Sequence, residues 1–347
     1  MRFEIKKLLS NKISAVLFAL IMAGSFIYFA STHQMFTRRA VTPEYSAMAE
    51  QFQLEYNKQY NEHCEAVIRS AERIKAESSD KYTIRLSEKI ISTCENRREL
   101  PIGDNSAVTW FKVILDDTYI TLLLVIFCVL ISAQLFCGDR SSGVFKLNFT
   151  AKNGRLVLYK NKILTLMIVS AFAAVLYTIV QLAVILLKYP LADINAPLQM
   201  EKAYLNCAYN IGFLEYVLVT MGTRILSCWF MCFLTGCLSL VFGNIIASAA
   251  VGAGGCVLLF ILFDRTLATH GGTEVSITKY VLHHILLKFS PICLLDPNGY
   301  FISREYANVF GRPVTELAFG IAFTAVVTAA LAVFGGYLFT RRRRALS

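Results

Sequence analysis

Six apolar runs, each long enough to cross a bilayer, constrain this chain more than any other feature. An α-helix rises 1.5 Å per residue, so about 20 apolar residues span roughly 30 Å of hydrocarbon. The predicted spans are residues 13–30, 118–137, 163–187, 224–242, 245–263 and 317–340. Hydrophobic residues make up 56% of the 347 residues and charged residues only 17%, unlike a soluble domain. We expect an all-α integral membrane protein with six transmembrane helices.

The charge distribution predicts how these helices are oriented. Residues 1–12 hold four Lys or Arg, residues 138–162 hold six and residues 341–347 hold four, against two acidic residues in the three segments together. These segments carry more net positive charge than the whole chain, which is +10. Because positive residues collect on the cytoplasmic side, both termini are predicted to be cytoplasmic. Charge divided among three membrane-flanking segments argues against nucleic-acid binding.

The long connection over residues 31–117 predicts an extracytoplasmic helical hairpin. Apolar residues recur every three or four positions from Tyr45 to Ile74, which is the pattern of one apolar helix face. Residues 78–80 break that pattern and offer an N-cap for a second helix over 81–98.

The remaining connections are shorter. Residues 1–12 read as an amphipathic helix in the inner interface. Residues 188–223 and 264–316 are predicted to be extracytoplasmic, the latter with a re-entrant or interfacial helix over 275–289. A tight turn is expected at Gly243–Asn244, between the fourth and fifth spans.

Cys64 and Cys94 are the only cysteines in the predicted hairpin, and both fall on its apolar faces. Outside the cytoplasm a disulfide between them is chemically allowed. Closing a loop of about 30 residues would stabilise the hairpin by about 3 kcal/mol. The alternative is a pair of buried free thiols.

Two polar residues, Gln181 and Arg224, belong to predicted spans and are candidates for a translocation path, since polar groups inside a membrane are often functional. Placing Arg224 in mid-bilayer would cost about 2.5 kcal/mol or more. The fourth span is therefore predicted to begin at Arg224, with the side chain reaching the outer interface. The competing interpretations are a helix–helix hydrogen bond for Gln181 and an interfacial anchor for Arg224.

Several kinds of chemistry have no sequence signal. The chain contains no G-x-x-x-x-G-K-[ST] phosphate-binding loop, and no H-E-x-x-H or G-x-S-x-G motif of a hydrolase. The cysteine and histidine spacings do not favour a metal site. We expect a non-catalytic membrane subunit without a cofactor of its own.

The segment between the second and third spans has a distinctive residue order. Asp139 is followed by Gly143, an apolar and basic stretch with Lys146, then Arg155 and a final Lys162. This order, together with the six-span topology, resembles the permease subunits of ABC-2-type ABC transporters. There, E-x-x-x-G, L-x-x-x-P-x-x-R and a final Lys connect the same two spans. Asp139 stands in place of the Glu, and the Pro before the Arg is missing.

The resemblance implies a type V ABC exporter fold and a mechanism. Residues 138–162 would form a coupling helix that rests on a separate ABC ATPase subunit, with Asp139, Gly143, Lys146, Arg155 and Lys162 as the ATPase-coupling residues. Two ATPase subunits, which bind ATP and Mg²⁺, would drive two permease copies, identical or related. The cargo would be hydrophobic or amphipathic, such as a bacteriocin-like peptide, a drug or a lipid-like molecule, exported across a bacterial plasma membrane.

Two alternatives stay open. The chain could instead be a membrane sensor whose outer hairpin binds an extracellular peptide without transport. The 138–162 segment could also be a basic loop that lies on anionic lipid.

Overall fold

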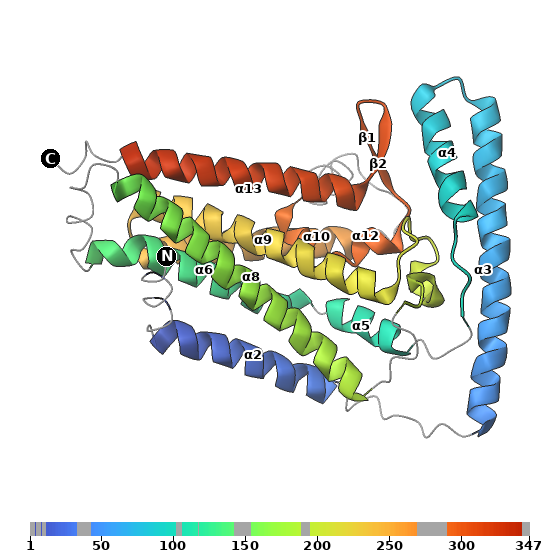
Figure 1. The fold of residues 1–347 in the computed structure, drawn as a ribbon, viewed down its shortest axis with the longest axis horizontal. Helices are drawn as coiled ribbons and strands as arrows, with labels where there is room; N and C mark the ends of the chain where they lie inside the picture. Colours follow the sequence, from blue (N-terminus) through green and yellow to red (C-terminus); the bar gives the residue numbers. More distant parts are fainter. Residues whose placement is uncertain are drawn as a thin grey trace.

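The computed structural model of this protein is mostly helical (Figure 1). It describes residues 4, 8, 12–32, 43–101, 106–116, 118–141, 154–188, 195–268 and 290–341. The predicted re-entrant helix, residues 142–153 of the 138–162 connection and most of the two terminal segments lie outside these residues.

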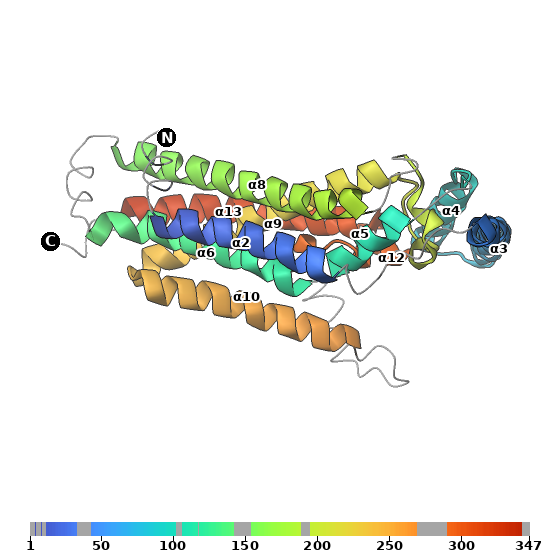
Figure 2. The same cartoon turned by 90° about the horizontal axis from the view of Figure 1, so that it is seen from below.

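The centre of the molecule is an elongated bundle of apolar helices. Its members are α2 (Lys12–Thr32), α6 (Thr118–Ser141), α8 (Gly154–Lys188), α9 (Phe213–Phe242), α10 (Ile245–Ala268) and α13 (Glu316–Arg341). Helix α9 packs against α6, α8, α10 and α13, while α2 packs on α6 and α8. Figure 2 shows the same helices running side by side along the long axis.

Five helices in the described part of the chain are long and apolar enough to cross a membrane. Their spanning segments are Ser14–Ser31, Thr121–Gly138, Gly154–Leu187, Phe213–Phe242 and Glu316–Arg341. The described apolar stretch of α10, Ile245–Leu258, is shorter. The chain is therefore built as a multi-pass helical membrane protein. Helix α8 begins at Gly154 rather than at the predicted 163, so the last nine residues of the predicted cytoplasmic segment belong to the third apolar helix.

Glycines bring α9 close to its neighbours in the bundle. A Cβ at Gly236 would lie 2.7 Å from the Phe136 ring of α6, closer than real Cβ contacts allow. Gly243 ends α9 with φ of 69°, and the Asn244 side chain then accepts a 2.8 Å hydrogen bond from the N–H of Ile246 at the start of α10. The predicted tight turn between these helices is present.

The predicted helical hairpin consists of α3 (Pro43–Glu77) and α4 (Lys81–Glu95). Asp80 is the N-cap of α4, as predicted, and accepts hydrogen bonds from the N–H groups of Tyr82 at 3.3 Å and Thr83 at 3.0 Å. Helix α3 runs across one end of the bundle, and Figure 2 views it end-on. The second helix ends at Glu95, three residues before its predicted end.

One strand pair departs from the all-helical expectation. Strands β1 (Tyr306–Val309) and β2 (Arg312–Thr315) pair antiparallel just before α13. Phe310 (φ 50°) and Gly311 (φ 74°) form their two-residue turn, with both residues in the left-handed region. The Arg85 side chain of α4 donates a 3.0 Å hydrogen bond to the Gly311 carbonyl, which ties this turn to the α3–α4 hairpin.

Short elements complete the molecule. They are α5 (Ser106–Asp116), the 3₁₀ turns η1 (Leu198–Met200), η2 (Lys202–Tyr204) and η5 (Pro291–Leu295), and α12 (Gly299–Ile302). All five residues of η5 are buried, and η5 packs against α9, α10 and α13.

Candidate functional site: a buried arginine at the centre of the bundle

Gln181 and Arg224, the two candidate polar residues of the translocation path, meet in the bundle interior. One terminal nitrogen of Arg224, Nη1, donates hydrogen bonds to Gln181 Oε1 and, at 3.0 Å, to Thr178 Oγ1, both on α8. Its Nε donates to the Leu295 carbonyl of η5 at 2.9 Å. The guanidinium lies over the Tyr177 ring, 5.3 Å from the centroid. The Arg224, Gln181 and Thr178 side chains are all 0% exposed.

The helix that contains Arg224 begins before the predicted span, and the position of Arg224 at the head of that span stays a prediction. Helix α9 begins at Phe213, so Arg224 lies about 16 Å further along its axis, about two-fifths of the way along the helix. Residues 213–222, predicted to be extracytoplasmic, form the first turns of this helix. The side chain is enclosed by protein, where acceptors on α8 and η5 take the hydrogen bonds that water would otherwise accept.

The backbone of η5 is satisfied by α9 at two points. Ser227 Oγ donates a hydrogen bond to the Pro291 carbonyl at 2.7 Å. At the other end of the turn, Arg224 Nε donates one to the Leu295 carbonyl. Irregular backbone at membrane depth is tolerated only where it is enclosed by protein or lines a water-filled cavity. Side chains of one helix therefore hold a non-helical segment in the interior of an apolar bundle.

A second polar network lies nearer the N-terminal end of α9. The hydroxyls of Tyr204 and Tyr216 lie 2.7 Å and 3.3 Å from Asn298 Oδ1 and 3.1 Å from each other. Both tyrosines are 0% exposed and Asn298 is 2% exposed. This network joins η2, α9 and the segment that follows η5.

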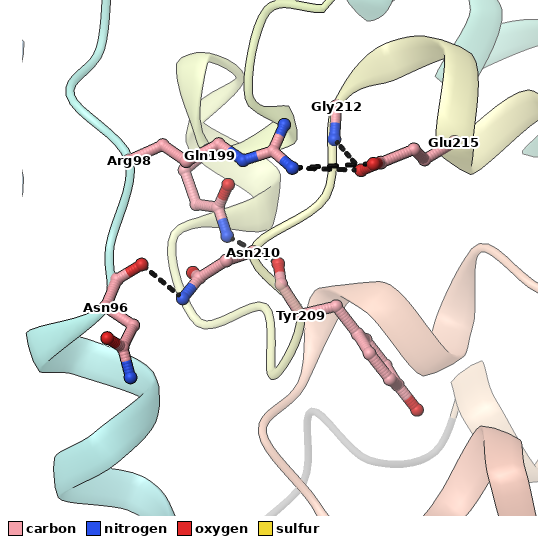
Figure 3. Close-up of polar contacts among 7 residues, drawn as sticks. All are labelled: Asn96, Arg98, Gln199, Tyr209, Asn210, Gly212 and Glu215. Carbon is pink, nitrogen blue, oxygen red and sulfur yellow. Dashed lines mark hydrogen bonds and ion pairs between the residues drawn. The ribbon is translucent and has the colours of Figure 1, made fainter.

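Glu215 lies in the first turn of α9 and caps its N-terminus. Its Oε2 accepts a 2.8 Å hydrogen bond from the Gly212 N–H and pairs with Arg98 at 3.3 Å (Figure 3). A carboxylate at a helix N-terminus is favourable because it faces unpaired backbone N–H groups and the positive end of the helix dipole. Arg98 follows α4, so this ion pair links the hairpin to the bundle.

Two more polar contacts strengthen this junction. At the C-terminal end of α4, Asn210 Nδ2 donates to the carbonyl of Thr93 at 2.8 Å. It also donates to the carbonyl of Asn96 at 3.0 Å (Figure 3). Tyr56 of α3 donates from its hydroxyl to the Gln199 carbonyl of η1 at 2.7 Å. Burial raises the pKa of Tyr56 to about 12, so the hydroxyl stays a donor across the physiological pH range. The hairpin is thus fastened to the bundle through residues 196–215.

The five predicted ATPase-coupling residues fall into three groups: two lie near helix ends, one is buried in the bundle, and two lie outside the described residues. Asp139 belongs to the last turn of α6, and Arg155 to the first turn of α8. Gly143 and Lys146 lie outside the described residues. Lys162 lies within α8 rather than at its start, and its side chain is 0% exposed. Its Nζ donates a hydrogen bond to the Leu135 carbonyl of α6 and lies 5.7 Å from the centroid of the Phe136 ring. It therefore ties α8 to α6.

Cys64 and Cys94 come together in the core of the hairpin, with exposures of 1% and 2%. The two thiols are unbonded in the structure, and the disulfide stays a prediction. Arg304 Nη1 lies 3.1 Å from Cys94 Sγ. A hydrogen bond from Cys64 and the positive charge of Arg304 together lower the pKa of the Cys94 thiol, although burial opposes them. Within the described residues, no group of three or more His, Cys, Asp and Glu gathers as metal ligands would.

The sequence shows no sign of the hydrogen bonds from Ser227 to Pro291 and from Arg224 to Leu295, which join α9 to η5. Pro291 and Leu295 contribute backbone carbonyls, which carry no residue-type signal. Thr178 lies three positions before Gln181, so a polar face on the third span was the one signal that pointed to part of this cluster.

Comparison of the sequence with protein-family models and with curated proteins found no match.

Proposed function

We propose that this chain is the permease subunit of an ATP-driven ABC exporter of the ABC-2 type, which forms a path for a hydrophobic or amphipathic cargo. The observation that carries the proposal is the position of the basic segments. Helix α2 begins, α6 ends, α8 begins and α13 ends at the same end of the bundle, opposite the hairpin (Figure 1). These helix ends adjoin all three basic segments of the sequence, as expected of a cytoplasmic face.

In this proposal α10 is the sixth span. It is 24 residues long, begins with the apolar stretch Ile245–Leu258 and follows α9 after a tight turn at the basic end of the bundle. An even number of spans returns the chain to the side on which it started, which agrees with basic segments at both termini. The hairpin is then extracytoplasmic.

The connection between α6 and α8 is the proposed docking site for the ATPase. Asp139 and Arg155 border it on the two helices, and Gly143 and Lys146 belong to it. Lys162 serves a different purpose: its hydrogen bond to Leu135 couples the two helices, so a push on the connection moves α6 and α8 together. ATP and Mg²⁺ bind the partner, which supplies the P-loop that this chain lacks.

Co-purification with the ATPase tests this proposal. The chain, expressed with its natural neighbours and extracted in mild detergent, is expected to carry a soluble ATPase identified by its P-loop peptide. Reversing charge with Lys146→Glu and Arg155→Glu should weaken this association and lower ATP-dependent transport in reconstituted vesicles. The matched control is Lys202→Glu, an exposed lysine near the hairpin end of the bundle, which should leave both unchanged. A chain that purifies alone and membranes without ATP-dependent transport would contradict the proposal.

One observation favours the sensor alternative. Helices α3 and α4 enclose an apolar groove of about 320 Å³, lined by side chains that include Val67, Ile74, Leu86 and Ile90. A groove of this size could take the apolar side chains of an extracellular peptide. Peptide binding that persists without any ATPase partner, together with an absence of transport, would favour a sensor over an exporter.

A further inference from the structure

The surroundings of Arg224 contain more hydrogen-bond donors than acceptors. Three buried polar atoms here have no partner: Arg224 Nη2, Gln181 Nε2 and Thr220 Oγ1. Thr220 lies one turn before Arg224 on the same face of α9. All three side chains are 0% exposed. An unmade hydrogen bond is costly in a bundle interior because no water can replace the partner.

The positive charge of Arg224 is also not neutralised by an adjacent carboxylate. Among the residues that the structure describes, no carboxylate forms an ion pair with Arg224. Asp296, which follows Leu295, attracts the guanidinium by its charge without an ion-pair contact to it. The direct partners are the neutral oxygens of Thr178, Gln181 and Leu295 and the ring of Tyr177. One anion at this place would supply both the missing charge and the missing acceptors.

We propose that Arg224, Gln181 and Thr220 form an intramembrane binding site for an oxyanion, a carboxylate or a phosphate, of the molecule that the chain transports. The inference rests on the proposed function and adds the chemical class of the cargo: amphipathic and anionic. A guanidinium presents planar paired donors that match the oxygens of carboxylate and phosphate. A donor-rich cluster of this kind would repel a cation.

The position of the site agrees with transport. On α9 it lies within the first half of the helix, about 10–16 Å from the N-terminal end, where η5 packs against α9. Transporters bind substrates near the bilayer midplane, beside broken helices and irregular backbone. Every member of the site is buried in this conformation, so the anion gains access when α8 or η5 separates from α9 and the hydrogen bonds of Arg224 are exchanged.

Binding of a simple amphipathic anion to the purified chain tests the inference. The chain is placed in nanodiscs of zwitterionic lipid without any ATPase, and its thermal unfolding midpoint is followed as dodecyl phosphate is added. A ligand that binds the folded state raises the midpoint with its concentration. Dodecyl phosphate should do so in the wild type, and dodecyltrimethylammonium, with the same chain length and opposite charge, should not.

The decisive variant is Gln181→Glu. It places a carboxylate beside Arg224 at nearly unchanged volume, so it should raise the midpoint without ligand and weaken dodecyl phosphate binding about tenfold to a hundredfold. Arg224→Gln should also abolish the response, but only if that variant folds. The matched control, Gln134→Glu, makes the same chemical change on α6, where the glutamine accepts a hydrogen bond from Ser14, and should leave the affinity unchanged.

Further arms identify the source of the anion. Competition by phosphatidylglycerol would assign the site to a lipid headgroup, and no competition would assign it to another amphipathic molecule; both support an oxyanion site. The inference is overturned if inorganic phosphate alone gives the full response, if the cationic detergent stabilises equally, or if Gln181→Glu binds dodecyl phosphate as the wild type does. Because no ATPase is present, this result is independent of the co-purification that tests the proposed function.

Discussion

Two arginines, one at the hairpin junction and one in the bundle, perform similar tasks in different surroundings. Arg98 pairs with Glu215 at 3.3 Å, and the two side chains are 42% and 51% exposed. Arg224 is 0% exposed and is held by Thr178, Gln181 and Leu295. Each ties two elements together, yet only at the junction can water replace a lost partner.

The difference concerns geometry as much as burial. At the junction the interaction is a charge pair that any cation of similar reach can make, and solvent screens it. In the bundle one planar guanidinium contacts α8 with Nη1 and η5 with Nε. We conclude that the bundle depends on the shape of its arginine, whereas the junction depends only on the presence of a charge.

Replacing each arginine by lysine tests this difference and gives the largest expected loss of stability. Arg224→Lys keeps the charge, but one ammonium group cannot reach the acceptors on both α8 and η5. Leaving these buried acceptors unpaired should cost about 3–5 kcal/mol of unfolding free energy. Arg98→Lys should change it by about 0.5 kcal/mol or less. Denaturant titration of both variants in the same detergent measures the difference.

Labelling of Cys293 locates the damage of Arg224→Lys. This cysteine belongs to η5 and is 7% exposed. Its reaction with a maleimide should accelerate in Arg224→Lys and stay at the wild-type rate in Arg98→Lys. Equal stability losses in the two variants, or unchanged labelling of Cys293, would show that the bundle does not depend on the shape of the arginine.

The oxidation state of the cysteines also distinguishes the hairpin from the bundle, with the second-largest expected effect on stability. If the hairpin is extracytoplasmic, Cys64 and Cys94 should be bridged in protein taken from oxidising conditions, as peptide mapping without reductant would reveal. Their replacement by Ala in the double variant should then lower stability by about 3 kcal/mol. The buried bundle cysteines Cys128, Cys228 and Cys232 should stay reduced in the same sample. Free thiols at Cys64 and Cys94 in this sample would contradict both the disulfide and its predicted stabilisation of the hairpin.

Most of the hairpin could be predicted from the sequence because its stability is local. The apolar stripe of α3 includes Tyr56, Tyr60 and Cys64, which are buried, and its exposed faces carry ion pairs four residues apart such as Lys58–Glu62. Such periodic patterns depend only on neighbouring residues. The β-hairpin was missed for the opposite reason: its strands are four residues long, and a Phe at the first left-handed turn position is unusual.

The bundle was predicted in outline, and Gln181 and Arg224 were named as candidates, but their contacts with each other and with η5 were not predicted. Hydropathy identifies apolar helices because it sums residues one at a time. It does not reveal the surroundings of Arg224 for the same reason, since it treats a buried arginine as unpaired. The Leu295 carbonyl, which accepts a hydrogen bond from Arg224, lies 71 residues away in the sequence. No sequence pattern marks a backbone carbonyl as such a partner. Polar groups in a bundle become interpretable only once the tertiary contacts are known.

The smallest expected effect concerns Asp80, on the water-exposed side of the comparison. Its hydrogen bonds from Thr83 and Tyr82 lower the pKa of the carboxyl in the folded hairpin. A depressed folded pKa means that the cap stabilises α4 at pH values above the unfolded pKa, near pH 4. This stabilisation is lost as pH falls through the folded pKa.

Protection factors for hydrogen exchange at Thr83 and Ile84 should therefore fall on acidification. Asp80→Asn keeps a capping oxygen that does not titrate, so its protection should fall less, whereas Asp80→Ala should reduce protection at every pH. An equal acid response in wild type and Asp80→Asn would assign the loss to other carboxylates.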